Sequence, residues 1–120
     1  MSIQKIPKSE LKIMKFIWKL NTDLSSKDVI KAMEYEYDWK STTTLTLLSK
    51  LVKRGFLEAD KINKITHYKI LTTKKAYLQF ATRQFLDTVH SGSMNSLIES
   101  LIHCTSSSND TLNGNDINKF

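Results

Sequence analysis

Three stretches in the first half of the chain carry apolar residues three and four positions apart, the spacing that places side chains on one face of an α-helix. The stretches cover about residues 10–20, 26–36 and 41–53. Their apolar positions are Leu11, Ile13, Met14, Phe16, Ile17 and Trp18, then Val29, Ile30 and Met33, then Leu47, Leu48, Leu51 and Val52. The pattern predicts three helices that each bury one face.

The residues at the ends of these stretches are typical of helix boundaries. Ser9 is the expected N-cap of the first helix, and Ser41 or a threonine just after it is the expected N-cap of the third. Ser25 to Asp28 has the sequence of a capping box. The third helix should end at Lys53-Arg54-Gly55. Cations are favourable at the negative end of a helix, and glycine adopts positive φ readily.

After Gly55 the apolar pattern changes from helical to alternating. Residues 56–60 and 65–70 alternate as half-buried strands do, and residues 61–64 join them, with Asn63 as the expected turn residue. Three helices followed by a two-stranded hairpin predict a winged helix-turn-helix. In that fold the third helix enters the major groove of DNA, and the hairpin wing reaches a flanking phosphate or the minor groove.

The second half of the chain contains two further helical patterns. Thr72 or Thr73 is the expected cap of a fourth helix that runs to about Val89, and a short fifth helix follows the break at Ser91-Gly92-Ser93. From Thr105 onward the sequence is polar and rich in turn-forming residues, which predicts disorder.

Together these patterns predict a mainly α fold with a small β-hairpin. We expect residues 1–72 to form a winged-helix DNA-binding domain, residues 73–104 a helical dimerisation region and residues 105–120 a tail. The last two helices carry more large apolar side chains than one small domain can hide, and a second copy of the chain is the simplest way to bury them. The expected dimer contacts are Tyr77, Phe80, Phe85, Val89, Leu97, Ile98, Leu101 and Ile102.

Basic residues are concentrated in the first part of the chain. Residues 1–75 hold 16 of the 18 Lys and Arg residues but only 8 of the 12 Asp and Glu residues. Between Lys40 and Gly55 there is no carboxylate, whereas a solvated helix face normally mixes both charges. This composition suits a polyanion such as DNA. The expected DNA contacts are Lys40, Ser41, Thr42, Thr43, Leu45, Thr46, Lys50 and Lys53 in the third helix, and Lys61 and Lys64 at the hairpin tip.

The remaining residue types argue against several other classes of protein. Cys104 is the single cysteine, so an internal disulfide is impossible and a reducing cytoplasm is the expected location. The adjacent His103 and Cys104 would point about 100° apart on a helix, so we expect no metal ion or other cofactor. No grouping typical of a catalytic site is present, so we expect no enzymatic activity. Trp18 and Trp39 are expected to pack in the core and at a helix junction rather than to stack on bases.

Two other functions remain open from composition and fold. A winged helix can bind protein instead of DNA, although such a module would not need a third helix bearing only hydroxyls and cations. A basic protein can also bind an anionic membrane surface, but that requires the cations to lie along one amphipathic helix. Here the cations are spread over helices and a hairpin.

Several residues are similar to the pattern of the penicillinase repressor family, the group that includes BlaI, MecI and CopY. The resemblance covers roughly residues 6–102. The matching positions are Glu10 to Trp18, then Trp39, Thr43, Thr46, Leu47, Lys50-Leu51 and Lys53 to Phe56, then Asn63 to Ile65 before Tyr68, and Asn95 to Leu97. The resemblance implies a homodimeric transcriptional repressor that binds a two-fold symmetric operator and dimerises through the helices after the wing. In many members of the family, which control antibiotic-resistance genes of the β-lactamase type or stress genes, a sensor-linked protease relieves repression by cutting the dimerisation region.

Two departures from the family concern the third helix. Leu45 stands where close relatives often have Arg or Gln, and a leucine can contact a thymine methyl group but cannot pair with guanine. Lys40-Ser41 replaces a Ser-Pro pair, and Thr42 replaces a frequent lysine. These changes imply a different operator sequence with the same docking mode.

Two further departures concern the C-terminal region. Copper-responsive members carry paired cysteines, so Cys104 alone excludes a copper thiolate cluster. The scissile Asn-Phe bond of the family corresponds to Ser100-Leu101, which gives no support to cleavage at this position. Residues 105–120 also lack the apolar stripe of the last family helix.

Overall fold

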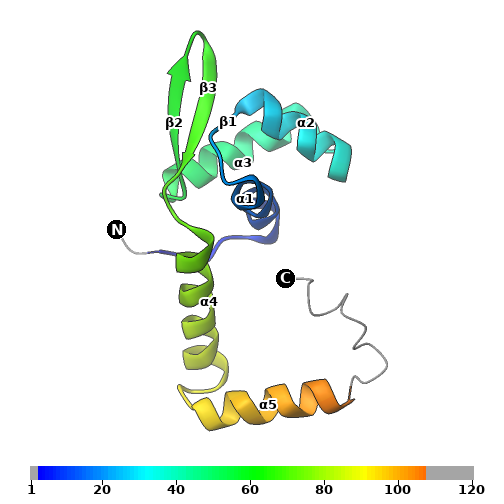
Figure 1. Cartoon of the computed structure of the whole chain (residues 1–120), viewed down its shortest axis with the longest axis vertical. Helices are drawn as coiled ribbons and strands as arrows, with labels where there is room; N and C mark the ends of the chain where they lie inside the picture. The colour runs from blue at the N-terminus through cyan, green and yellow to red at the C-terminus, as the bar shows by residue number, and fades with distance from the viewer. Residues whose placement is uncertain (1–2, 108–120) are drawn as a thin grey trace. The chain divides into compact units, whose positions relative to one another are not determined.

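The computed structural model describes residues 3–107 of the chain (Figure 1). Its elements in order are α1 (Lys8–Leu20), β1 (Leu24–Ser25), α2 (Ser26–Tyr37), α3 (Ser41–Lys53), β2 (Leu57–Ile62), β3 (Ile65–Ile70), α4 (Lys74–Val89) and α5 (Met94–Ser107). This arrangement confirms the predicted class, mainly α with a small hairpin. Two compact units divide the chain, one ending at Ala81, which we call the head, and one beginning at Thr82, which we call the rear unit.

The core of the head is built from the predicted faces of the three helices and from the start of the hairpin. The apolar side chains that are at most 2% exposed are Ile13, Met14 and Ile17 of α1, Val29 and Met33 of α2, Leu48 and Leu51 of α3, and Phe56 and Leu57. Full burial of such side chains stabilises the fold by about 1.5–3 kcal/mol each. Ile30 and Val52, which belong to the predicted apolar faces, are only half-buried.

The helix boundaries agree with the sequence at some positions and correct it at others. The capping box is confirmed, because the Asp28 amide donates to Ser25 Oγ (3.2 Å) and the Ser25 amide donates to Asp28 Oδ2 (3.1 Å). Ser9 and Ser41 are not N-caps: Pro7 and Lys40 hold those positions, without a side-chain cap bond. Both residues have the extended backbone of an N-cap, with ψ of 161° and 151°, so the serines already lie inside the first helical turn.

The hairpin is longer than predicted and has a tighter turn. Lys61 and Ile62 belong to β2, where they lie opposite Thr66 and Ile65 of β3. The connection is the pair Asn63-Lys64, with φ of 51° and 69°, the positive values that a two-residue type I′ turn requires.

The sheet has a third strand that the sequence did not predict. β1 pairs antiparallel with β3 through Leu24 opposite Tyr68, which gives the strand order β1-β3-β2. A strand of two residues is too short to show alternation, so no sequence pattern identifies it. Pairing on both sides makes β3 the central strand and ties the hairpin to the connection between α1 and α2.

The fourth and fifth helices form largely as predicted. The Ala76 amide donates to Thr73 Oγ1 (3.1 Å), so Thr73 caps α4. Ser91 and Gly92 have φ of 52° and 77° at the predicted break. α5 continues to Ser107, three residues past the predicted end of ordered structure at residue 104, so the start of the predicted disordered tail is helical. The rest of that tail lies outside the described residues.

Candidate nucleic-acid interface

The polar face of α3 is exposed to solvent. The predicted contact residues in and before this helix are all exposed: Lys40, Ser41, Thr42, Thr43, Leu45, Thr46, Lys50 and Lys53. Ser49 is exposed on the same helix. A shallow depression lined by Thr42, Thr43, Thr46 and Leu47 marks its first turns. The helix therefore presents hydroxyl groups near its start and ammonium groups near its end, with no carboxylate between them.

The Thr46 hydroxyl is already used within the helix. It donates to the backbone carbonyl of Thr42 over 2.9 Å, the back-bonding that threonine commonly makes inside helices. Its methyl group and the acceptor lone pairs of its oxygen remain available on an exposed side chain. Thr46 is therefore better suited to contact an apolar group, such as a thymine methyl, than to donate to a base edge.

Thr44 behaves differently from the threonines around it. It is 0% exposed, and its Oγ1 has no hydrogen-bond partner among the described residues. Thr44, Leu48 and Leu51 lie four and seven positions apart, so their spacing places all three on the buried face. Thr44 was not among the predicted core residues, although its spacing from Leu48 and Leu51 was the signal that could have identified it. Its burial fixes which side of the threonine run faces outward.

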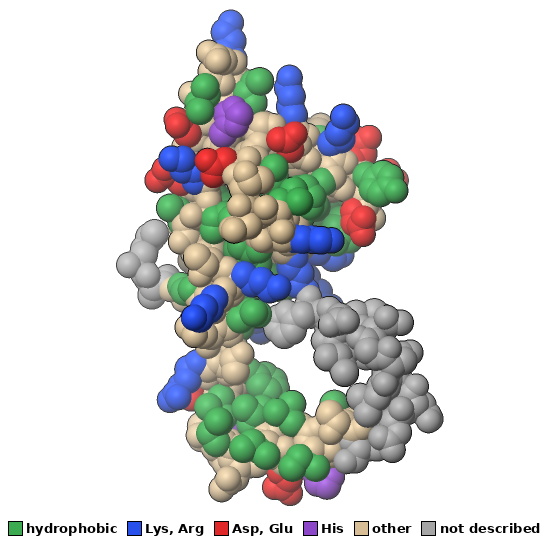
Figure 2. Space-filling model, viewed as in Figure 1, with side chains coloured by type: hydrophobic (Ala, Val, Ile, Leu, Met, Phe, Trp, Pro, Cys, Tyr) green, Lys and Arg blue, Asp and Glu red, His purple; other side chains and the backbone are tan. Residues whose placement is uncertain are grey.

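The hairpin tip carries the second group of predicted contacts. Lys61, Asn63 and Lys64 are exposed there, and Ile62 beside them is 49% exposed. Figure 1 shows the paired strands extending well beyond the three helices, and Figure 2 shows a cationic side chain at the far end. The structure thus places the two lysines on a projecting arm, at the opposite end of the strands from the connection to α3. Ile62 is an exposed apolar tip residue that the sequence analysis assigned to the turn.

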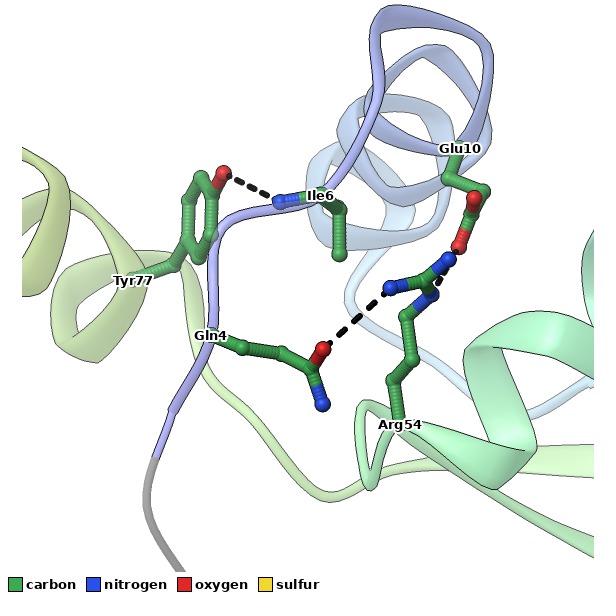
Figure 3. Close-up of polar contacts among 5 residues, drawn as sticks. All are labelled: Gln4, Ile6, Glu10, Arg54 and Tyr77. Carbon is green, nitrogen blue, oxygen red and sulfur yellow. Dashed lines mark hydrogen bonds and ion pairs between the residues drawn. The ribbon is translucent and has the colours of Figure 1, made fainter.

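Arg54 holds the C-terminal end of α3 (Figure 3). Its Nε lies 2.9 Å from Oε1 of Glu10, and its Nη1 donates to Oε1 of Gln4 over 3.2 Å. Glu10 is 1% exposed, although it belongs to the first turn of α1. The contact is an ion pair without hydrogen-bond geometry, since that oxygen has no hydrogen-bond partner. From the sequence, Arg54 was predicted only as a favourable cation at a helix end, and its pairing with Glu10 was not predicted.

The same network reaches α4 through the segment before α1. The Ile6 amide donates to the hydroxyl of Tyr77 over 3.1 Å, and this bond is buried. Gln4 and Ile6 therefore connect the end of α3 to the first turns of α4. Arg54 is a positioning residue, because its guanidinium is held against a buried carboxylate that requires a compensating charge.

The predicted dimer contacts divide into two groups. Tyr77 is 4% exposed, and its ring lies 5.8 Å from Trp18 and 5.4 Å from Phe56, measured between ring centroids. Tyr77 thus belongs to the core of the head, where its ring already has intramolecular partners. Phe80 is partly buried against the same core. The physical reason is that α4 begins inside the head, so its first apolar positions already have intramolecular partners.

The other predicted dimer contacts lie in the rear unit. The exposed ones are Phe85, Val89, Ile98, Leu101 and Ile102, each between 48% and 60% exposed. Figure 2 shows hydrophobic side chains gathered where α4 meets α5. Leu97 is half-buried, and Leu86, which the sequence analysis did not select, is 7% exposed. The rear unit therefore presents a contiguous set of large apolar side chains to solvent.

Other kinds of site have little support in residues 3–107. Within that range no group of three or more His, Cys, Asp or Glu side chains could hold a metal ion. No helix in the described part of the chain has the length and apolar character needed to cross a bilayer. Burial raises the pKa of the Tyr68 hydroxyl, which reflects the position of its ring on the inner face of β3.

Comparison with known sequences identifies relatives of this chain. The family model described as penicillinase repressor matches residues 6–119. The penicillinase repressor of Bacillus licheniformis is 29% identical over 118 residues, covering 98% of this chain and 88% of that protein. The methicillin resistance regulatory protein MecI of Staphylococcus aureus is 28% identical over 107 residues, covering 89% of this chain and 86% of that protein.

Two solved structures share the fold of the head. The solution structure of the DNA-binding domain of the repressor BlaI superposes with a TM-score of 0.58 at 30% identity. The solution structure of Bacillus licheniformis BlaI, in its monomeric form in complex with the blaP half-operator, gives a TM-score of 0.54 at 30% identity. Each covers 63% of this chain, and this chain covers 92% of each.

Proposed function

This chain belongs to the penicillinase repressor family, and from that membership we propose that it is a DNA-binding transcriptional repressor acting as a homodimer on a two-fold symmetric operator. The observation that carries the proposal is the outer face of α3. This face is exposed and carries hydroxyl groups and lysines but no carboxylate. The head that contains it is similar in fold to BlaI, whose structure was solved in complex with a half-operator. A repressor meets its operator in the cytoplasm, where we place the protein.

In the proposed complex the lysines contact the DNA phosphates. Lys40, Lys50 and Lys53 of the third helix region bind phosphates beside the major groove, and Lys61 and Lys64 of the wing bind a flanking phosphate or enter the minor groove. Such contacts fix the register of the protein on the duplex without reading its sequence.

In the proposed complex the exposed residues in the first turns of α3 contact the base edges. Thr42, Thr43, Leu45 and Thr46 lie where a recognition helix contacts base edges, with Ser41 at its first turn. Leucine and threonine favour thymine methyl groups and lack the paired donors that guanine rewards. We therefore propose an A·T-rich half-site, repeated about one helical turn away on the symmetric partner.

The rear unit supplies the dimer contact in this proposal. Its exposed apolar side chains would leave a large hydrophobic surface in water unless a second copy covered them. Release from DNA by a sensor-linked protease, which the family suggests, has no support at Ser100-Leu101, because that pair lacks the Asn-Phe of the family.

The domain boundary is best placed later than residue 72. Tyr77 packs within the core of the head, and Phe80 lies against that core. We propose that the DNA-binding domain extends through the first turns of α4 to about Ala81, where the head ends. Residues beyond that point form the dimerisation region.

A salt titration of DNA binding tests this function. The full chain is titrated by gel shift against duplex DNA from upstream of its own coding region, at a series of salt concentrations. A lysine that neutralises a phosphate releases counterions, so replacing Lys61 and Lys64 with Ala should lower the slope of log K against log salt by about 0.9 for each phosphate left without its lysine. The variant Lys69→Ala is the matched control, because Lys69 is exposed on the same hairpin away from its tip.

The possible outcomes separate the competing functions. An unchanged slope in the double variant would remove the wing from the interface but leave the third helix in place. Failure of the native chain to bind any duplex more tightly than random DNA would favour the alternative, a winged-helix module that binds protein.

A further inference from the structure

A groove on the head lies between α1 and α2 and takes no part in the proposed DNA contact. Two adjoining depressions, of about 390 and 630 Å³, share Phe16, Leu20, Ala32 and Tyr35 as lining residues. Tyr35 is 89% exposed and Leu20 is 48% exposed. Phe16 and Ala32 are half-buried against the core of the head, whereas Leu20 and Tyr35 remain largely exposed to solvent.

Tyr35 has the character of an anchor residue. An exposed aromatic side chain beside an apolar groove is typical of a binding hot spot, because its ring buries a large area while its hydroxyl stays at the wet rim. At 89% exposure it contributes almost nothing to the stability of the head itself. Its solvent exposure is therefore better explained by contact with another molecule than by folding.

The two edges of the groove carry opposite charge. Along α1, the lining residues include Lys12, Lys15 and Lys19, three cations at helical spacing. Along α2, they include the carboxylates of Asp28 and Glu36. Lys31 is a cation on the α2 edge, so that edge is negative by one charge. A foreign acidic segment would match only the α1 edge, whereas a second copy turned about a two-fold axis that runs along the groove would bring each edge against its opposite.

We propose that this groove binds the same groove of a second copy of the chain, in a head-to-head contact between protomers of different dimers. The contact is isologous, so the Tyr35 ring of each head inserts beside Leu20 and Phe16 of the other. It is separate from the dimer contact of the rear unit. Resting on the proposed function, it would join two repressor dimers on neighbouring operators.

The size of the groove sets the strength of this contact. Four shared lining residues and their charged edges form a small interface, of the class that gives weak and transient association in free solution. Two heads held on one duplex have a much higher effective concentration, so a weak contact becomes effective there. The expected result is cooperative binding to paired operators.

The first experiment measures cooperativity on DNA. An operator obtained by selection from randomised duplexes is placed once, or twice at centre-to-centre spacings that vary by single base pairs over two helical turns. The native chain should bind the paired site cooperatively at one or more spacings, by roughly tenfold. Tyr35→Ser should abolish that factor while leaving single-site affinity unchanged. Cooperativity that persists in Tyr35→Ser, or is absent at every spacing, would overturn the proposal.

A charge exchange gives the sharper test. The paired change Lys12→Glu with Lys19→Glu takes the α1 edge from three positive charges to a net charge of −1, and Glu36→Lys takes the α2 edge to +1. Each change made without the other should reduce cooperativity, because it leaves like net charges on facing edges. The combined variant should recover it, since every edge then again meets its opposite. Lys8→Glu is the matched control, because Lys8 is an exposed cation of α1 outside the groove. A combined variant no better than either change alone would contradict the two-fold arrangement.

A measurement without DNA separates this proposal from the proposed function. Sedimentation of the full chain at high concentration should show dimers in equilibrium with tetramers, and Tyr35→Ser should remove the tetramers alone. If that holds while no operator is found, the groove proposal stands and the repressor proposal fails. If the chain forms no tetramer, and a synthetic acidic amphipathic peptide binds in a Tyr35-dependent manner, the occupant is a foreign segment and the self-association proposal is wrong.

Discussion

Leu45 is a bulky apolar side chain on a face of α3 that otherwise consists of hydroxyls and lysines. It is 41% exposed, whereas the adjacent Thr44 is completely buried. The helix backbone fixes this difference, since neighbouring residues point about 100° apart. Leu45 therefore belongs to the surface that meets DNA in the proposed complex and has no role in the core of the head.

Replacing Leu45 with Arg should change the preferred base at one position of each half-site. Arginine can pair with guanine, so we expect roughly 1–3 kcal/mol of new discrimination. Half-site spacing should not change, because it depends on the dimer. Selection on randomised duplexes measures both quantities. Recovery of the same guanine-containing site by native and variant chains would contradict the assignment of Leu45 to base reading.

Replacing Glu10 with Gln should destabilise the head. The change leaves the Arg54 guanidinium facing a neutral amide in a site where Glu10 is 1% exposed. The Arg54 side chain is 31% exposed, so water compensates in part, and we expect a decrease of about 1–3 kcal/mol in the free energy of unfolding. Urea denaturation measures it. The control variant Glu34→Gln changes an exposed carboxylate of α2, and its free energy of unfolding should lie within about 0.5 kcal/mol of that of the native chain. Equal decreases in both variants would show that the Glu10–Arg54 ion pair does not stabilise the head.

At the scale of elements, the sequence predicted the helices and the hairpin because each has its own periodicity. The Ser25–Asp28 capping box and the Ser91–Ser93 break were predicted because their chemistry is local. β1 was not predicted, because a strand of two residues has no periodicity and forms only through its pairing with β3. The packing of Tyr77 in the core of the head was not predicted for a similar reason: an apolar stripe on α4 does not show whether its partner is the same chain or another.

A fragment comparison tests where the DNA-binding domain ends. Residues 1–81 should fold cooperatively, whereas residues 1–72 lack Tyr77 and leave Trp18 and Phe56 without its ring. The shorter fragment should be less stable by about 3–5 kcal/mol, the cost of removing a large buried aromatic side chain. Thermal unfolding followed by near-UV circular dichroism measures the difference. Tyr77→Ala within residues 1–81 should reproduce most of it, and equal stability of the two fragments would place the boundary at residue 72.

At the scale of the whole molecule, the exposed apolar side chains of the rear unit predict its oligomeric state. Replacing Ile98 and Leu101 with Asp should convert the dimer to a monomer, because each substitution would remove about 1.5–3 kcal/mol of apolar burial. Light scattering measures the mass, and a gel shift on a paired half-site should show weaker binding. Ser100→Asp is the control: it adds a charge at an exposed polar position of α5 without removing an apolar side chain, so this variant should stay dimeric. A double variant at Ile98 and Leu101 that remains dimeric would place the interface elsewhere.

The separation between the two faces of α3 also bears on how such a repressor can evolve. Thr44, Leu48 and Leu51 maintain the fold from the inner side, while Thr42 and Leu45 lie on the outer side. Substitutions at exposed positions away from special features usually change stability by no more than about 0.5 kcal/mol. Mutational drift on the outer face can therefore alter which promoter is recognised without endangering the folded state. Duplicated copies of such a gene could acquire new regulatory targets through a few surface mutations while each intermediate still folds.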